Sequence, residues 1–240
     1  MRIFIIRHGD PYYPTDSLTD KGRREAELLG RRLAGEHITH AYVSPLGRAK
    51  LTAAPTLAAT GLTAKELEWL REFPAPLAPD FAYETKMGEK NRCPWNMPPE
   101  CWTGVPGGWR NAPFYEDGRV QARYDLVCRG WDELLAGHGF VRDGGFYRVL
   151  PGRDEPPETL ALFCHLGLGC ALLSHILHLS LTAVWHTLFL PTSSVTTVFM
   201  EHHRSKRIAL ARLVSVGDTS HLYAGGEPVS ASGLHTDLIR

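Results

Sequence analysis

The stretch RIFIIRHG, residues 2–9, decides the fold of this chain. Residues 2–6 form a short apolar run rich in β-branched side chains, which is typical of a strand buried on both faces in a parallel sheet. Arg7, His8 and Gly9 follow at the carboxyl end of that strand. Because open α/β sheets bind their ligands just beyond the carboxyl ends of their strands, we expect these three residues to lie in a functional site.

Strands and helices alternate beyond this first strand. Thr19 can cap a helix through Leu33, because apolar residues recur there at helical spacing. Pro55 should kink the next helix or end its regular hydrogen bonding, because proline has no N–H to donate. The hydrophobic pattern predicts further helices at Leu46–Thr60, Val120–Ala136 and Leu168–Leu179. It predicts strands at Ala41–Val43 and Thr159–Cys164, and a short strand or edge segment at Leu67–Phe73.

Antiparallel strands are predicted in the second half of the chain. Val195–Met200 and Ile208–Val216 should pair and close the sheet, and Phe140–Val149 should form a hairpin. The tail from Gly225 is rich in turn residues and should be irregular. We therefore predict the α/β class: a three-layer α/β/α fold with a mostly parallel central sheet and one antiparallel edge.

Residues 74–118 interrupt this alternation, because they are rich in Pro, Gly, Trp and Asn and lack a regular period. A loop of that length inside a compact domain is uncommon unless it is functional. We predict a lid or specificity insertion at about residues 74–118 within one domain that spans residues 1–240. Trp95, Trp102 and Trp109 would give the insertion a small core.

The composition narrows the class of protein. The chain has 240 residues with 26 basic and 26 acidic side chains, so no global charge draws it to nucleic acid or to an anionic membrane. Its five cysteines are odd in number and lack a C-x-x-C spacing, which argues against a zinc ribbon and a disulfide framework. No apolar run approaches the length of a membrane span. We expect a cytoplasmic protein; oligomeric state leaves no signal in the sequence.

Two more polar motifs follow predicted strands. SPLGRA, residues 44–49, comes after the second strand, and HLG, residues 165–167, comes after the strand at Thr159–Cys164. Together the three motifs bring two guanidiniums and two imidazoles toward one edge of the sheet. Arginine offers bidentate donors to a phosphoryl group, helix N-termini add backbone N–H groups, and a neutral imidazole can attack phosphorus.

These motifs resemble the histidine phosphatase superfamily, also called phosphoglycerate-mutase-like. RHG at residues 7–9 matches its signature, LTDKG at residues 18–22 matches the L-T-x-x-G that opens the first helix, and SPLGRA with Thr52 and Ala53 matches the second motif. The resemblance covers residues 1–72 closely and residues 159–222 more loosely.

The resemblance implies a role for each motif residue. His8 would be the nucleophile, Arg7 and Arg48 would clamp the phosphoryl oxygens, and His165 would complete the site and stabilise the transferring group. The reaction would run through phospho-His8 in two in-line displacements, with no metal and no organic cofactor. The expected partner is a small phosphorylated substrate, with phosphate or another oxyanion in the same site.

The general acid is less well defined by the motifs. The family's L-x-E segment corresponds to residues 70–72, so Glu72 would protonate the leaving oxygen and then activate water. The family's usual G-x-W-E-G continuation is replaced by PAP at residues 74–76, so Glu84, Glu89 and Asp10 remain alternatives. The third motif also departs from the family, because it reads H-L-G where H-G is commoner.

Ordinary structural roles compete with these functional ones. Arg48 could form surface ion pairs, His165 could be a satisfied core histidine, and Glu72 could be a surface partner of Arg71. We expect His221 to fix a loop rather than to act in catalysis. The cluster His202-His203-Arg204 should lie in an exposed hairpin turn, and an adjacent histidine pair is poorly spaced for a shared metal on either a strand or a helix.

The sequence therefore favours a phosphomonoester hydrolase, with two alternatives. A phosphoglycerate-type mutase would carry S-x-W-N and F-x-G-W after its R-H-G, whereas this chain has DPYYP at residues 10–14. A non-catalytic phospholigand-binding protein would not need a nucleophile, and the presence of His8 and His165 counts against it.

Overall fold

A computed structural model describes residues 1–73, 95, 108–112, 115, 118–152 and 157–234, and the backbone of residues 83–84 and 90–91. Within that part of the chain, no helix is long and apolar enough to cross a membrane.

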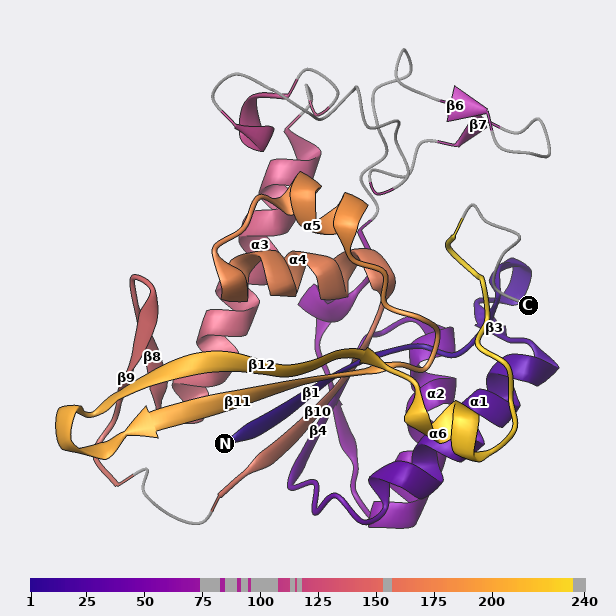
Figure 1. Cartoon of the computed structure of the whole chain (residues 1–240), viewed down its shortest axis with the longest axis horizontal. Coiled ribbons are helices and arrows are strands. Elements are labelled where there is room, and N and C mark those ends of the chain that lie inside the picture. The colour runs from indigo at the N-terminus through magenta and orange to yellow at the C-terminus, as the bar shows by residue number, and fades with distance from the viewer. Residues whose placement is uncertain are drawn as a thin grey trace.

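One eight-stranded sheet forms the centre of the molecule (Figure 1). Its four parallel strands are followed by an antiparallel half that begins where β1 pairs with β11. The order across the sheet is β5 (Ala64–Glu66), β4 (His40–Val43), β10 (Thr159–Cys164), β1 (Arg2–Arg7), β11 (Val195–His203), β12 (Ile208–Asp218), β9 (Phe146–Val149) and β8 (Phe140–Asp143). Two short hairpins lie outside this sheet: β2 (Pro11–Tyr12) with β3 (Ser17–Leu18), and β6 (Tyr83–Glu84) with β7 (Lys90–Asn91).

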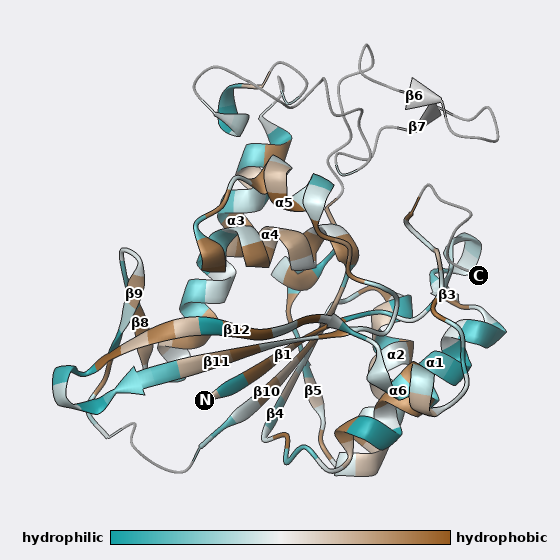
Figure 2. Cartoon of the chain, in the orientation of Figure 1, coloured by the Kyte–Doolittle hydropathy of each residue, from teal (hydrophilic) through white to brown (hydrophobic). Residues whose placement is uncertain are grey.

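Helices cover both faces of the sheet, which confirms the predicted three layers (Figure 1). One side carries α1 (Asp20–Leu33), α2 (Gly47–Thr60) and the short α6 (Ser220–Ala224); the other carries α3 (Arg119–Gly137), α4 (Leu166–Leu177) and α5 (Leu181–Thr187). The central strand β1 is buried between them: Ile3 and Ile5 join the core under α4, and Phe4 and Ile6 join the core under α1 and α2. Figure 2 shows the hydrophobic colouring of these central strands and of α4.

Local signals place most elements where the sequence predicts them. The side chain of Thr19 caps α1, because its Oγ1 accepts a hydrogen bond from the N–H of Gly22 at 3.1 Å. Helix α2 continues through Pro55 to Thr60 and ends at Gly61, whose φ of 71° suits a left-handed cap. The predicted hairpin at Phe140–Val149 and the antiparallel pair that follows Val195 are both present.

Two predicted elements were wrong. Leu67–Phe73 is not a strand: the edge strand β5 comes earlier, and a 3-10 helix occupies Glu68–Leu70. An edge strand needs few apolar residues, so the hydrophobic pattern does not indicate the charged β5. The apolar residues that suggested a strand belong instead to the 3-10 helix, which buries Leu70 completely. His202 and His203 end β11, and the turn itself lies at Arg204–Lys206.

Most of the predicted insertion lies outside the described residues, and so does Trp102. Trp95 packs against Trp185 of α5, with ring centroids 6.0 Å apart, and Trp109 packs against Tyr124 of α3 at 5.1 Å. These two tryptophans therefore pack on the main core instead of forming a separate one. The role of residues 74–118 as a lid stays a prediction.

Candidate active site

The carboxyl ends of β1, β10 and β4 meet at one edge of the sheet and carry the three motifs. β1 leads into His8, β10 into His165 and β4 into Ser44. The sheet ladder holds these ends in place, because the N–H of His8 donates to the carbonyl of Cys164 at 3.0 Å. The rings of His8 and His165 lie 5.1 Å apart. The structure thus brings the two predicted imidazoles together.

His8 has its imidazole tautomer set by the backbone. Its Nδ1 lies 2.7 Å from the carbonyl oxygen of Gly9, which can only accept, so Nδ1 carries the proton and Nε2 carries the lone pair. Burial lowers the pKa of His8 well below its ordinary value, and the charges of Arg7 and Arg48 lower that pKa further. His8 is therefore a neutral imidazole with an available lone pair.

His165 is completely buried beside it. Its Nε2 lies 2.7 Å from the hydroxyl of Ser44, and its Nδ1 is buried with no hydrogen-bond partner. Burial lowers the pKa of His165 well below its ordinary value, followed by the effects of His8 and Arg48. A satisfied core histidine would have a partner for both nitrogens, so that explanation does not fit His165.

The guanidiniums of Arg7 and Arg48 are buried next to the two imidazoles. Arg7 donates through Nη1 to the carbonyl of Leu190 at 2.6 Å and through Nη2 to that of Ser232 at 2.9 Å. Arg48 forms an ion pair with Asp16. The Nε of each arginine is buried without a partner. Arg48 is only 9% exposed, so it is not the surface residue of the alternative explanation.

Three buried nitrogens therefore lack hydrogen-bond partners in one cluster: Nε of Arg7, Nε of Arg48 and Nδ1 of His165. The two guanidinium nitrogens are donors, and Nδ1 of His165 is a donor when Nε2 accepts from Ser44. A buried polar group without a partner costs on the order of 1–3 kcal/mol. Proteins keep such unpaired groups at sites where a ligand supplies the missing acceptors. A compact anion with several oxygens fits this set of donors.

Glu72 lies next to the cluster, at the N-terminus of α4. Its Oε2 accepts from the N–H of Gly167 at 3.1 Å, and its Oε1 accepts from Leu168 and Phe73, both at 2.9 Å. The carboxylate thus satisfies backbone donors that α4 itself leaves unpaired. Glu72 is not a surface partner of Arg71, because Arg71 pairs with Glu68 at 2.7 Å.

The third motif, HLG, needs a glycine at position 167. A Cβ at this position would lie 2.5 Å from the ring of Trp95 and 2.9 Å from Oε1 of Glu72. Only glycine lets the α4 backbone approach these two side chains so closely. The glycine of HLG therefore serves the packing of Trp95 and Glu72 over the first turn of α4.

The alternative acids differ in what surrounds them. Asp10 accepts from the hydroxyl of Ser230 at 2.5 Å and from that of Thr19 at 2.8 Å, so both of its carboxyl oxygens bind side chains of the surrounding loops. Glu89 and the side chain of Glu84 lie outside the described residues.

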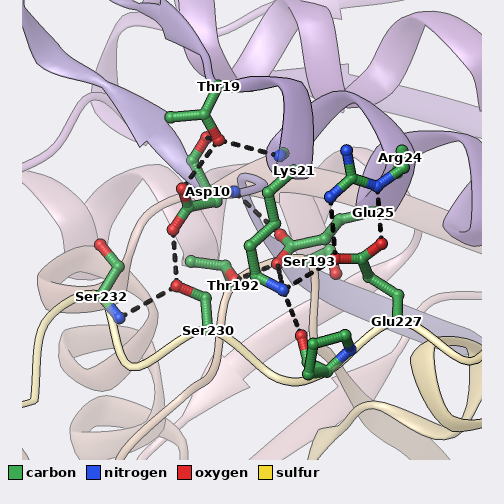
Figure 3. A network of polar contacts seen from close by, with 12 residues as sticks. Asp10, Thr19, Lys21, Arg24, Glu25, Thr192, Ser193, Glu227, Ser230 and Ser232 are labelled. Carbon is green, nitrogen blue, oxygen red and sulfur yellow. Dashed lines mark hydrogen bonds and ion pairs between the residues drawn. The ribbon is translucent and has the colours of Figure 1, made fainter. Parts of the chain in front are cut away.

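Two residues support the loop after β1: Glu25, which no motif includes, and Thr52, which the second motif includes without indicating this contact. Glu25 is completely buried, accepts from the N–H of Asp10 at 2.8 Å and from the hydroxyl of Thr192 at 3.0 Å, and has its pKa raised by burial (Figure 3). Thr52 accepts from the N–H of Gly9 at 2.9 Å. The available signal was helical spacing, because Glu25 lies four residues before the buried Leu29 and so shares its face.

His221 fixes a loop, as predicted. Its Nε2 lies 3.0 Å from the hydroxyl of Ser193, and the N–H of Ser193 donates to the carbonyl of His8 at 3.0 Å. Ser193 has a φ of 55°, which a non-glycine residue rarely adopts unless its surroundings hold it. Burial lowers the pKa of His221 to about 4, assisted by the charge of Arg32.

The C-terminal segment folds back over the same loop (Figure 3). Glu227 accepts from Lys21 at 2.9 Å and from Arg24 at 2.7 Å, and Ser230 donates to Asp10. The segment also reaches the cluster, where the carbonyl of Ser232 accepts from Arg7. The tail from Gly225 is irregular up to residue 234, as the sequence predicted, yet it is held by specific contacts.

Together, the fold and the site define an α/β protein with a cluster of buried arginines and histidines at the carboxyl edge of its parallel strands. Residues 3–85 match the model of the histidine phosphatase superfamily (branch 1). The sequence has no match among curated proteins.

Solved structures of phosphatases share the fold. A phosphoserine phosphatase from Entamoeba histolytica, in complex with 3-phosphoglyceric acid, has a TM-score of 0.61 and 18% identity, with 92% of this chain and 98% of that chain covered. A mycobacterial glucosyl-3-phosphoglycerate phosphatase has a TM-score of 0.57 and 19% identity, with 90% of this chain and 98% of that chain covered. The N-terminal part of this chain therefore matches the superfamily model, and the chain shares its fold with these solved phosphatases.

Proposed function

We propose that this chain is a metal-independent phosphomonoester hydrolase that works through a phosphohistidine on His8. One observation carries the proposal: the cluster of His8 holds three buried nitrogens without partners, two of them guanidinium donors, and the tautomer of His8 leaves the lone pair on its Nε2. A phosphoryl group supplies oxygen acceptors for the donors and a phosphorus atom for the lone pair.

In the first displacement, Nε2 of His8 attacks phosphorus and the bond from phosphorus to the ester oxygen breaks. Arg7 and Arg48 stabilise the negative charge on the phosphoryl oxygens, because their guanidiniums remain charged. His165 donates from Nδ1 when the hydroxyl of Ser44 donates to its Nε2. In the second displacement, water attacks phosphorus, the bond to His8 breaks and inorganic phosphate leaves.

Glu72 is the proposed general acid, which protonates the leaving oxygen and then takes a proton from water. Its oxygens accept from the N–H groups of Gly167 and Leu168. Proton donation therefore requires Glu72 to release at least one of these backbone groups when the substrate binds, since an oxygen that donates to the ester has to turn toward it.

The comparisons support this function to different degrees. Solved structures of the mycobacterial phosphatase contain VO3 and inorganic phosphate, the kinds of oxyanion that we propose for this cluster. We propose a small phosphorylated substrate on the same reasoning, and the proposed steps use no organic cofactor. The cytoplasmic location stays a prediction from composition. The mutase alternative would need a second anion site. The non-catalytic alternative does not require the lone pair that His8 presents on Nε2.

The nucleophile is tested with His8→Ala in the full-length chain. Hydrolysis of p-nitrophenyl phosphate should fall to background, and no acid-labile phosphoprotein should form. His203→Ala is the matched control, because it removes an exposed histidine and should leave both readouts intact. Substantial turnover by folded His8→Ala protein would refute the mechanism, and phosphate binding without turnover by the wild-type protein would favour the non-catalytic alternative.

The general acid is tested with Glu72→Gln and two substrates. An alkyl phosphate needs a proton on its leaving oxygen, whereas nitrophenolate leaves without one, and a general acid contributes on the order of 100- to 10,000-fold. Rapid-quench formation of the phosphoenzyme should therefore slow far more for the alkyl ester. Equal, small effects on both substrates would exclude Glu72 and direct the same test to Glu84, Glu89 and Asp10.

A further inference from the structure

A second cluster of chemically active side chains lies at the opposite edge of the sheet. His40 opens β4, whose other end leads to Ser44, so at about 3.3 Å per residue roughly 13 Å of strand separates the two clusters. His138 follows α3, and Glu158 precedes β10. One ligand atom from each of His40, His138 and Glu158 lies within 4.8 Å of the other two.

We propose that His40, His138 and Glu158 bind a zinc ion. Two imidazoles and one carboxylate are a donor set that zinc accepts at about 2.0–2.2 Å. Tetrahedral ligands at that distance lie about 3.4 Å apart. Binding therefore needs side-chain movements on the order of 1 Å, which the partly exposed His40 and Glu158 can make.

The contacts of His40 allow the tautomer that coordination needs. Nδ1 of His40 lies 3.0 Å from the hydroxyl of Thr39, which lies 3.1 Å from the carbonyl oxygen of Thr159. When this hydroxyl donates to the carbonyl, it accepts from Nδ1 of His40, and Nε2 of His40 keeps its lone pair. A ligating histidine commonly donates its other N–H to a neighbouring oxygen in this way.

His138 is hydrogen-bonded through both of its nitrogens. Its Nδ1 lies 2.7 Å from Oε2 of Glu158, and its Nε2 lies 2.7 Å from the hydroxyl of Tyr42. A carboxylate can only accept, so Nδ1 carries the ring proton in the metal-free chain. An ion held by Nδ1 of His138 and by Glu158 would replace this proton. The ring proton would then lie on Nε2, where the hydroxyl of Tyr42 can accept it and orient the ring.

A cavity of about 460 Å³ adjoins this cluster and is lined by His40, Tyr42 and His138 together with Glu133 of α3. Residues Arg7, His8, Arg48 and His165 are not part of its lining. The cavity gives water or a small anion access to the remaining coordination position of the ion. Three protein ligands with one open position form a zinc site that exchanges its fourth ligand, separate from the proposed phosphohistidine chemistry.

Zinc titration of the tag-free, chelator-treated chain tests the site. Calorimetry should give one zinc ion per chain, and cobalt should produce visible absorption bands in its place. His40→Ala and the conservative Glu158→Gln should each weaken binding at least tenfold, since each removes a ligand. His203→Ala, which removes an exposed histidine elsewhere, should bind like the wild type.

His8→Ala separates the proposed zinc site from the candidate active site. Zinc binding should persist in His8→Ala, and His40→Ala should retain hydrolysis of p-nitrophenyl phosphate. The proposal is overturned by the absence of saturable binding, by unchanged affinity in His40→Ala and Glu158→Gln, or by loss of binding in His8→Ala. None of these results bears on whether His8 is the nucleophile.

Discussion

The buried His221 makes the stability of the fold sensitive to acid. Burial lowers the pKa of this imidazole from 6.5 to about 4, with a smaller contribution in the same direction from Arg32. In the unfolded chain His221 therefore binds a proton near pH 6.5, whereas in the folded chain it binds one only near pH 4. Stability is full above pH 6.5, falls as the pH drops through this window and levels off below pH 4.

The size of the effect follows from the two pKa values. Between about pH 7.5 and about pH 5, proton uptake by the unfolded state lowers the free energy of unfolding by about 2 kcal/mol for His221 alone. Burial lowers the pKa of His8 and His165 as well, so these groups add to the loss with the same sign. The contribution of His221 is isolated by comparison with His221→Gln, which keeps a polar group near Ser193.

Urea unfolding at these two pH values, followed by tryptophan fluorescence, measures the difference. The wild type should lose about 2 kcal/mol more than His221→Gln on acidification. His203→Gln removes an exposed histidine and should behave like the wild type. If the wild type and His221→Gln lose the same free energy within about 0.5 kcal/mol, the precision of the method, His221 is not a buried neutral group.

Glu72→Gln should lower the free energy of unfolding by about 1–3 kcal/mol, because its amide nitrogen would face a backbone N–H such as that of Gly167; unchanged urea midpoints would contradict the capping contacts. Thr52→Val should destabilise the chain by a similar amount, about 1–3 kcal/mol, because the N–H of Gly9 loses its acceptor, and Thr52→Ser should restore stability; equal effects of both variants would argue against this bond. Vanadate should compete with substrate in steady-state assays, and EDTA should leave turnover unchanged; inhibition by EDTA that a divalent ion reverses would indicate a metal in the reaction.

Local sequence determined the elements that carry the site. A buried apolar strand and a Thr cap are signals within a few residues, and they placed β1, β10 and α1 almost to the residue. The carboxyl ends of parallel strands share an edge by geometry, so the proximity of His8 and His165 also followed from the sequence. The charged edge strand β5 was not predicted, because it buries few side chains and shows no alternating hydrophobic pattern.

Only the tertiary structure decided which partners the polar side chains have. Glu72 binds the N–H of Gly167 across 95 residues, Thr192 binds Glu25 across 167, and Arg7 binds Ser232 across 225. Such contacts join segments that the fold brings together, and no local pattern records them. The sequence by itself named the reactive groups, because their chemistry resides in residue type and strand position. Their tautomers, burial and unpaired donors arise only when distant backbone carbonyls and hydroxyls surround them.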